Sequence, residues 1–98
     1  MSKKTKRVVL TRSTAGIFVG NLENYENKEA TLTDARRLWY WTGAASLSQL
    51  AQEGTSRPKD CKVPCAVDRV IITDVMEMLD VSDAAQKTLN KIPVWSAH

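Results

Sequence analysis

The chain has 98 residues, of which 43% are hydrophobic and 26% charged, a composition typical of a single globular domain. Its net charge of +3 comes from the amino end: residues 1–12 hold five basic and no acidic side chains, so the rest has nine basic and eleven acidic residues. Residues 13–98 therefore sum to −2, so the folded body is slightly acidic, which argues against a nucleic-acid binder, because such a protein usually carries basic residues on its folded face. Residues 1–7 are expected to form a disordered basic tail, and residues 8–98 a single α+β domain.

The first strands are predicted from short apolar runs between turn residues. Val8–Leu10 and Gly16–Leu22 each read as a strand, and the second is followed by a polar turn over Asn21–Lys28. A hairpin then returns along Glu29–Trp41, which is predicted to form one long strand. The alternation of apolar and polar residues slips at Asp34–Ala35, so an irregularity is expected there.

The end of this third strand, Arg36–Trp41, is the most distinctive stretch of the chain. Successive side chains of a strand point to opposite faces, so Arg37, Trp39 and Trp41 share one face, and Arg36 shares the other with Leu38 and Tyr40. Both faces then combine apolar bulk with a guanidinium. One interpretation is a core face and a second face covered by a helix or another subunit. The other is a recognition surface, because Trp, Tyr and Arg dominate binding hot spots.

A short helix is predicted directly after the aromatic stretch. Ser46 and Gln49 have the spacing of a capping box, and Gly54 fits a helix stop, so the helix is expected over Leu47–Glu53.

The second half is predicted to contain two strands and a helix. Val67–Leu79 reads as a long strand that is buried on both sides at its centre. Asp83, in capping-box spacing with Gln86, is expected to begin a helix over Ala84–Leu89. Ile92–Trp95 contains a proline, so it is expected as an edge strand. The predicted fold class is therefore α+β, with a curved, mainly antiparallel sheet of about five strands and two short helices.

The side chains needed for metal binding and catalysis are sparse. Cys61 and Cys65 are two potential metal ligands, whereas a zinc ion needs about four, and the only histidine is His98. We therefore expect no metal and no cofactor, with free thiols, Cys65 pointing inward and Cys61 outward. A usable general base, a Gly-rich nucleotide motif and a recognisable carboxylate pair are also missing, so an enzyme is not expected.

The small-residue loop before the helix offers a different chemistry. Backbone N–H groups at the start of a helix can hold a phosphate, to which an arginine could add a contact and a tryptophan a stacked ring. The alternative is that Ser46 already satisfies the helix start and that Gly43 only lets the chain turn. The candidate residues for binding a ligand or partner are Arg36, Arg37, Trp39, Trp41, Gly43, Ala44 and Ser46.

The segment from Thr31 to Ala51 resembles a family of small uncharacterised proteins encoded by tailed bacteriophages and prophages. The likeness continues through Pro58–Lys62, Val67–Val70 and Val94–Trp95. It implies a viral origin and expression in the bacterial cytoplasm, and no catalytic residues are carried over from it. Consistent with this, no apolar run approaches the roughly 20 residues of a membrane span, and no signal peptide is expected.

These observations favour a noncatalytic binding protein that forms a homo-oligomer and either engages a host protein or sequesters a small anionic ligand such as a nucleotide. One alternative is a virion or assembly component that buries its aromatic face against neighbouring copies. Another is a nucleic-acid-binding accessory protein that uses its lysine tail and stacked aromatic rings, although the acidic body disfavours it.

Overall fold

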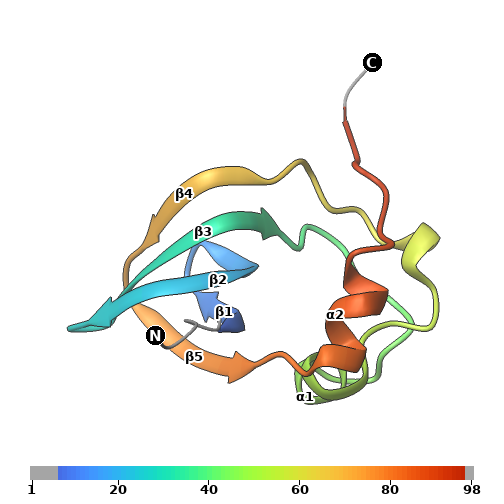
Figure 1. The fold of residues 1–98 in the computed structure, drawn as a ribbon, viewed down its shortest axis with the longest axis horizontal. Coiled ribbons are helices and arrows are strands. Elements are labelled where there is room, and N and C mark those ends of the chain that lie inside the picture. The colour runs from blue at the N-terminus through green and yellow to red at the C-terminus, as the bar shows by residue number, and fades with distance from the viewer. Residues whose placement is uncertain (1–6, 97–98) are drawn as a thin grey trace, which may run out of the picture.

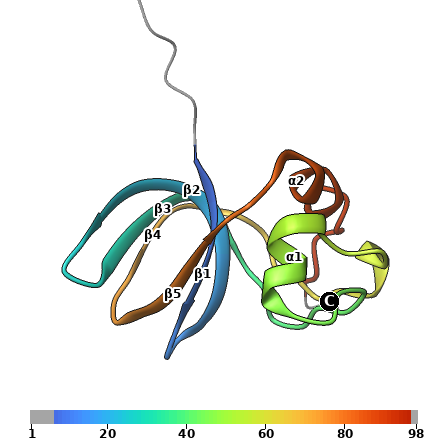
Figure 2. The same ribbon diagram turned by 90° about the horizontal axis from the view of Figure 1, so that it is seen from below.

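The computed structural model describes residues 7–96, which form an antiparallel sheet of five strands with two short α-helices, so the predicted α+β class is confirmed. The sheet occupies one side of the molecule and the helices the other, as two perpendicular views show (Figures 1 and 2). The elements are β1 (Val8–Ser13), β2 (Gly16–Glu26), β3 (Glu29–Arg37), α1 (Leu47–Glu53), the 3₁₀ turn η1 (Pro58–Asp60), β4 (Val67–Ile72), β5 (Val75–Asp80) and α2 (Asp83–Leu89).

The sheet is strongly curled, because its two edge strands are consecutive in the sequence. The strand order is β4-β3-β2-β1-β5, with every neighbouring pair antiparallel. In a flat sheet of this order, β4 and β5 would lie about 19 Å apart. Only Thr73 and Asp74 separate them, and the chain from Ile72 to Val75 can span no more than about 11 Å. Figure 1 shows the sheet rolled so that the two edges approach each other at this turn.

Residues with positive φ form the tight turns at this end of the sheet. Asn27 (φ 51°) and Lys28 (φ 64°) connect β2 to β3, which is the backbone of a two-residue hairpin turn that matches strand twist. Asp74 (φ 59°) takes the same left-handed region between β4 and β5. The backbone N–H of Val75 donates to the carbonyl of Lys28 at 2.9 Å, so the two turns are joined.

Two hydrophobic clusters divide the core. The first contains side chains from all five strands and lies inside the curled sheet; it comprises Val9, Phe18, Ala30, Leu32, Ala35, Ile72 and Val75. The second, called the helix-side core below, lies between the sheet and the helices and comprises Leu10, Leu38, Leu50, Ala51, Cys61, Val63, Leu89 and Ile92. Because Val9 and Leu10 are neighbours in β1, their side chains point to opposite faces and enter different clusters.

Both helices lie close to the positions predicted from the sequence. Helix α1 begins and ends where it is predicted, with the Ser46 hydroxyl accepting from the N–H of Gln49 and Gly54 closing the last turn. Helix α2 starts one residue earlier than expected, because its cap is Ser82, whose hydroxyl accepts from the N–H of Ala85. None of the helices in residues 7–96 has the length and apolarity that crossing a membrane would require.

Three strand predictions are wrong. Glu29–Trp41 is not one strand, because β3 ends at Arg37 and the backbone of Tyr40 pairs instead with Lys62. The expected strand over Val67–Leu79 is two strands on opposite edges of the sheet. Ile92–Trp95 forms no strand but contributes a single parallel bridge between Val94 and Val63.

The expected disordered tail, residues 1–7, falls outside the described residues except for Arg7. The Arg7 Nε pairs with a carboxylate oxygen of Asp80 at 2.6 Å, and the Arg7 carbonyl accepts from the N–H of Leu22 at 2.7 Å.

Candidate functional site

Arg36 is a structural anchor between β3 and two distant loops. Its Nε donates to the carbonyl of Pro64 at 3.0 Å, its Nη1 to that of Ile92 at 3.1 Å, and its Nη2 to those of Val63 and Pro93 at 2.9 and 3.2 Å. Four of the five guanidinium N–H groups are therefore used by backbone carbonyls. Side-chain burial lowers the pKa of Arg36 from its ordinary value and the electrostatic effect of Cys65 opposes this, but an arginine remains protonated.

Arg37, its neighbour in sequence, lies on the opposite side of the strand and is exposed. Its Nη1 donates to the carbonyl of Ala15 at 2.6 Å, and its guanidinium carbon lies 4.5 Å from the centre of the Phe18 ring. These contacts hold a cationic group in a fixed position at the surface, and within residues 7–96 its other N–H groups have no hydrogen-bond partner.

The exposed aromatic surface is built on a stacked pair of tryptophans from distant parts of the chain. The rings of Trp39 and Trp95 have centroids 6.2 Å apart and planes inclined by 16°, and the two residues are 64% and 44% exposed. The Lys62 amine lies 5.8 Å from the centre of the Trp95 ring. Tyr40, whose backbone pairs with that of Lys62, and Val94, the neighbour of Trp95 in the chain, are also exposed. We call Trp39, Tyr40, Lys62, Val94 and Trp95 the aromatic surface.

Backbone pairing outside the main sheet holds this surface. Tyr40 and Lys62 exchange two hydrogen bonds, from each N–H to the other carbonyl at 3.1 and 2.7 Å. On the other side of the same segment, the N–H of Trp95 donates to the carbonyl of Val63 at 3.0 Å. Three segments that are far apart in the sequence thus lie side by side.

Three of the predicted binding residues meet at a shallow groove beside this surface. The groove has a volume of about 310 Å³ and is lined by Arg37, Leu38, Trp39 and Trp41, together with Ala15 from the β1–β2 turn and Gly16 and Ile17 at the start of β2. Arg37, Trp39 and Trp41 thus lie on one side, as the alternation of side chains predicts, although the backbone that joins them leaves the strand after Arg37. Arg36 does not line this groove, and Trp41 is half-buried against the helix-side core.

The remaining predicted residues, Gly43, Ala44 and Ser46, support the fold. Gly43 has φ 85°, and a Cβ there would collide with the Thr55 hydroxyl and come within 2.7 Å of the Arg57 backbone nitrogen. Ala44 packs against the helix-side core. Ser46 caps α1, and the N–H of Ala45 donates to the side-chain oxygen of Gln49 at 2.7 Å. Two of the N–H groups considered for a phosphate, those of Ala45 and Gln49, therefore donate to protein side chains.

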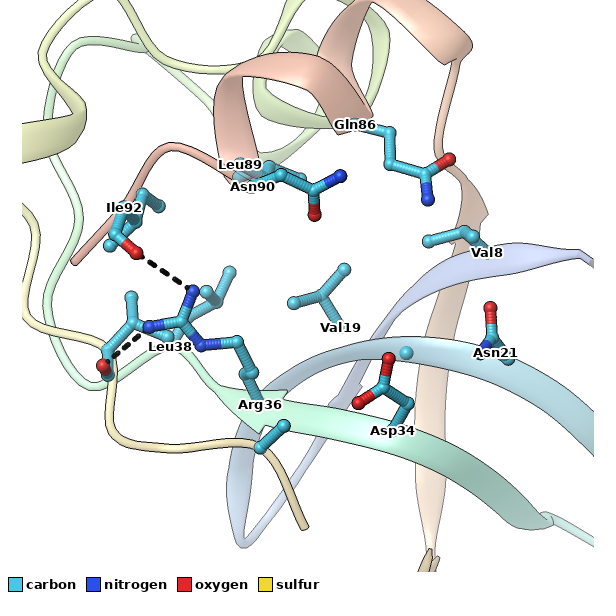
Figure 3. A pocket seen from close by; sticks show the side chains of 13 residues that line it. Val8, Val19, Asn21, Asp34, Arg36, Leu38, Gln86, Leu89, Asn90 and Ile92 are labelled. Carbon is cyan, nitrogen blue, oxygen red and sulfur yellow. Dashed lines mark hydrogen bonds between the residues drawn. The ribbon is translucent and has the colours of Figure 1, made fainter. Parts of the chain in front are cut away.

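A second concave site lies around Arg36, between the sheet and α2 (Figure 3). It is a cavity of about 100 Å³ whose polar lining includes Asn21, Asp34, Gln86 and Asn90, none of which is a predicted site residue. These residues come from three elements and form no local motif. The one sequence signal is the slip of alternation at Asp34–Ala35, which the structure confirms as a register shift against β2.

The two cysteines are free, but their orientation is the reverse of the prediction. Cys61 is buried in the helix-side core, with its sulfur 3.6 Å from the carbonyls of Thr42 and Arg57, and Cys65 is exposed. The flanking charges of Cys61 are misleading, because Cys61 caps the end of η1 and its side chain packs in the hydrophobic core. Within residues 7–96, no three His, Cys, Asp or Glu side chains gather as a metal site would require.

The fold and these sites define a small α+β protein with a curled antiparallel sheet, an exposed aromatic surface and a small polar-rimmed cavity. The chain belongs to the family described as Domain of unknown function (DUF6948), whose profile matches residues 5–89. No curated protein and no solved structure matches the chain.

Replacing Arg36 by lysine is expected to lower the free energy of unfolding by roughly 1–3 kcal/mol, because an ammonium cannot reach four carbonyls at once. The matched variant Arg37→Lys loses one exposed hydrogen bond and should change it by about 0.5 kcal/mol or less. Urea denaturation of both variants is the measurement. Equal effects would show that the Arg36 contacts do not hold the loops.

Gly43→Ala is expected to destabilise the protein by about 1–3 kcal/mol, since alanine is strained at this φ and its Cβ meets the 55–57 backbone and side chains. Ser48→Ala, an exposed change in α1, should stay within about 0.5 kcal/mol of wild type. Thermal and urea unfolding can compare them. A Gly43→Ala protein of wild-type stability would contradict the structural role given to this glycine.

Proposed function

We propose that this protein is a noncatalytic binding protein that engages another protein through the aromatic surface. The observation that supports this best is the stacked Trp39–Trp95 pair, which presents two large rings to solvent. Tryptophans are usually well buried, and a gathering of exposed apolar side chains often marks an interaction site. Trp, Tyr and Arg are also the residues that contribute most to binding energy in protein interfaces.

The aromatic surface is well suited to binding because its side chains are already positioned. The backbone bridges at Tyr40 and Val63 fix the segments, the two indole rings support each other, and the Ala15 carbonyl and Phe18 ring hold Arg37 at the adjoining groove. Binding of a partner would therefore cost little conformational entropy, because these side chains are already ordered. The groove is shallow, which favours a protruding side chain or loop of a protein over an enclosed small molecule.

A homo-oligomeric state is part of the proposal. Val67 and Ile71 on β4 and Met76 on β5 are exposed apolar residues on edge strands, which are surfaces that pair readily with another chain. The two edges differ, so joining β4 of one copy to β5 of the next gives a head-to-tail contact that forms either a ring or an open chain. An open chain corresponds to the alternative role as a virion or assembly component.

The proposed setting is a bacteriophage protein that acts on a host protein in the bacterial cytoplasm, supported by the resemblance of Thr31–Ala51 to phage and prophage proteins. The second candidate is binding of nucleic acid or a nucleotide, favoured by the position of Arg37 and Lys62 beside exposed rings on which bases could stack. It stands second to protein binding because residues 7–96 hold eleven basic and eleven acidic side chains, with no net positive charge, and because backbone carbonyls bind the guanidinium of Arg36.

Trp39→Ala is expected to reduce capture of a host protein about 30-fold, the effect of losing a hot-spot residue worth about 2 kcal/mol. The measurement is quantitative mass spectrometry of proteins retained by the immobilised protein from a lysate of the bacterium that carries its gene. Trp95→Ala should act in the same direction, because it removes the ring that supports Trp39.

Tyr25→Ala is the control, since Tyr25 is 50% exposed at the far end of β2. It should retain wild-type capture, and all variants should unfold at the same urea concentration as wild type. Equal capture by wild type and Trp39→Ala would refute the aromatic surface as the contact. Capture that disappears after nuclease treatment would favour the nucleic-acid alternative.

A further inference from the structure

The cavity beside Arg36 has the features of a small-molecule site separate from the aromatic surface. Its floor is apolar and belongs to the buried helix-side core, with Leu38, Val63, Leu89 and Ile92 all 5% exposed or less. Polar groups surround the opening: Asn21 and Asp34 come from the sheet, and facing them are Gln86 on α2 and Asn90, which caps the end of α2 (Figure 3). An apolar floor with a few convergent polar groups is the usual construction of a ligand pocket.

The polar groups at the opening are not used by the fold. Among the described residues, the side chains of Asn21, Asp34, Gln86 and Asn90 form no hydrogen bond or ion pair. The three amides can each donate and accept, and the carboxylate can only accept. The cavity therefore offers both kinds of hydrogen-bonding partner at one opening.

Two opposite charges flank the cavity without neutralising each other. Asp34 and Arg36 both come from β3, but within residues 7–96 neither is in an ion pair. The carbonyls around Arg36 hold its guanidinium in place, and one N–H on Nη1 is left without a carbonyl partner. Arg36 is half-buried and Asp34 is exposed at the rim, so an opposite charge brought into the cavity would interact more strongly with Arg36 than with Asp34.

A β-bulge places Asp34 at this opening. Arg36 pairs with Val19 and Thr33 with Asn21, so Asp34 and Ala35 together oppose the single residue Gly20. A Cβ on Gly20 would lie 2.9 Å from the Cβ of Ala35, and Asp34 takes a left-handed backbone with φ 50°. Bulges and strained residues of this kind often aim a side chain at a functional site.

The size and the charges together restrict the ligand. A volume of about 100 Å³ is well below the roughly 300 Å³ at which pockets for drug-sized ligands begin, so a nucleotide does not fit. A carboxylate at the opening also disfavours a polyanion. We propose that the cavity binds a small amino-acid zwitterion, with its carboxylate toward Arg36, its ammonium toward Asp34 and a short aliphatic side chain on the apolar floor.

L-alanine is the probe that tests this, compared with propionate, which lacks the ammonium, and ethylamine, which lacks the carboxylate. In ¹⁵N NMR titrations of the full chain, L-alanine should shift the backbone signals of residues 19–21, 34–36 and 86–90 and bind at least about tenfold more tightly than either analogue. No shift of these signals with L-alanine, or equal binding of the three compounds, would overturn the proposal.

Asp34→Asn identifies the group that holds the ammonium. Asparagine tolerates a left-handed backbone, so the variant should fold, and it should bind L-alanine about tenfold more weakly while binding propionate no more weakly than wild type does. Asp74→Asn makes the same change at an exposed residue with φ 59° outside the cavity and should bind as wild type does. If Asp34→Asn kept the wild-type preference for L-alanine, the proposed orientation would be wrong.

Trp39→Ala separates this inference from the proposed function. Because Trp39 does not line the cavity, this variant should bind L-alanine as wild type does even where it loses its protein partner. Loss of both activities in a folded Trp39→Ala protein would overturn the cavity as an independent site.

Discussion

The guanidinium of Arg36 connects the curled sheet to the segments that carry both proposed sites. It reaches the carbonyls of Val63 and Pro64 on one segment and of Ile92 and Pro93 on another. The aromatic surface lies on the continuation of these segments, and the cavity lies beside the guanidinium itself. No acidic side chain in the described chain pairs with this half-buried charge, so carbonyl dipoles compensate for its desolvation. One cation therefore sets the geometry of two surfaces.

The sequence predicts well those parts of the fold whose causes are local. Ser46, Gln49 and Gly54 define α1, because capping groups act within one turn of the helix. The failures involve partners distant in sequence. The residues after Arg37 have the composition of a strand, but Tyr40 finds its backbone partner at Lys62 instead of on β2. Likewise, the turn at Thr73–Asp74 is missed because apolar residues flank it on both sides and its own turn signal is weak. The sequence alone does not reveal that the residues before it pair with β3 and those after it with β1.

The same distinction applies to the sites. Arg36 and Arg37 are identical neighbours, and only the tertiary structure shows that carbonyls from two loops surround the first while the second remains at the surface. The aromatic stretch is conspicuous in sequence and does contribute to a surface, but its stacking partner, Trp95, is supplied by a segment 56 residues away. The cavity residues Asn21, Asp34 and Gln86 are ordinary polar residues in sequence, and their convergence depends on the bulge and on the docking of α2.

The short link between the edge strands has a consequence for how the domain opens. In most sheets an edge strand can separate from its neighbour alone. Here Thr73 and Asp74 are too short a link for the end of β4 to move far from β3 without pulling the start of β5 away from β1. The N–H of Val75 is also bonded to the β2–β3 turn, so the same movement would disturb the central hairpin. Amide protons on the two outer ladders should therefore exchange with solvent in one cooperative event, although β1, β2 and β3 lie between the two edge strands in the order of the sheet.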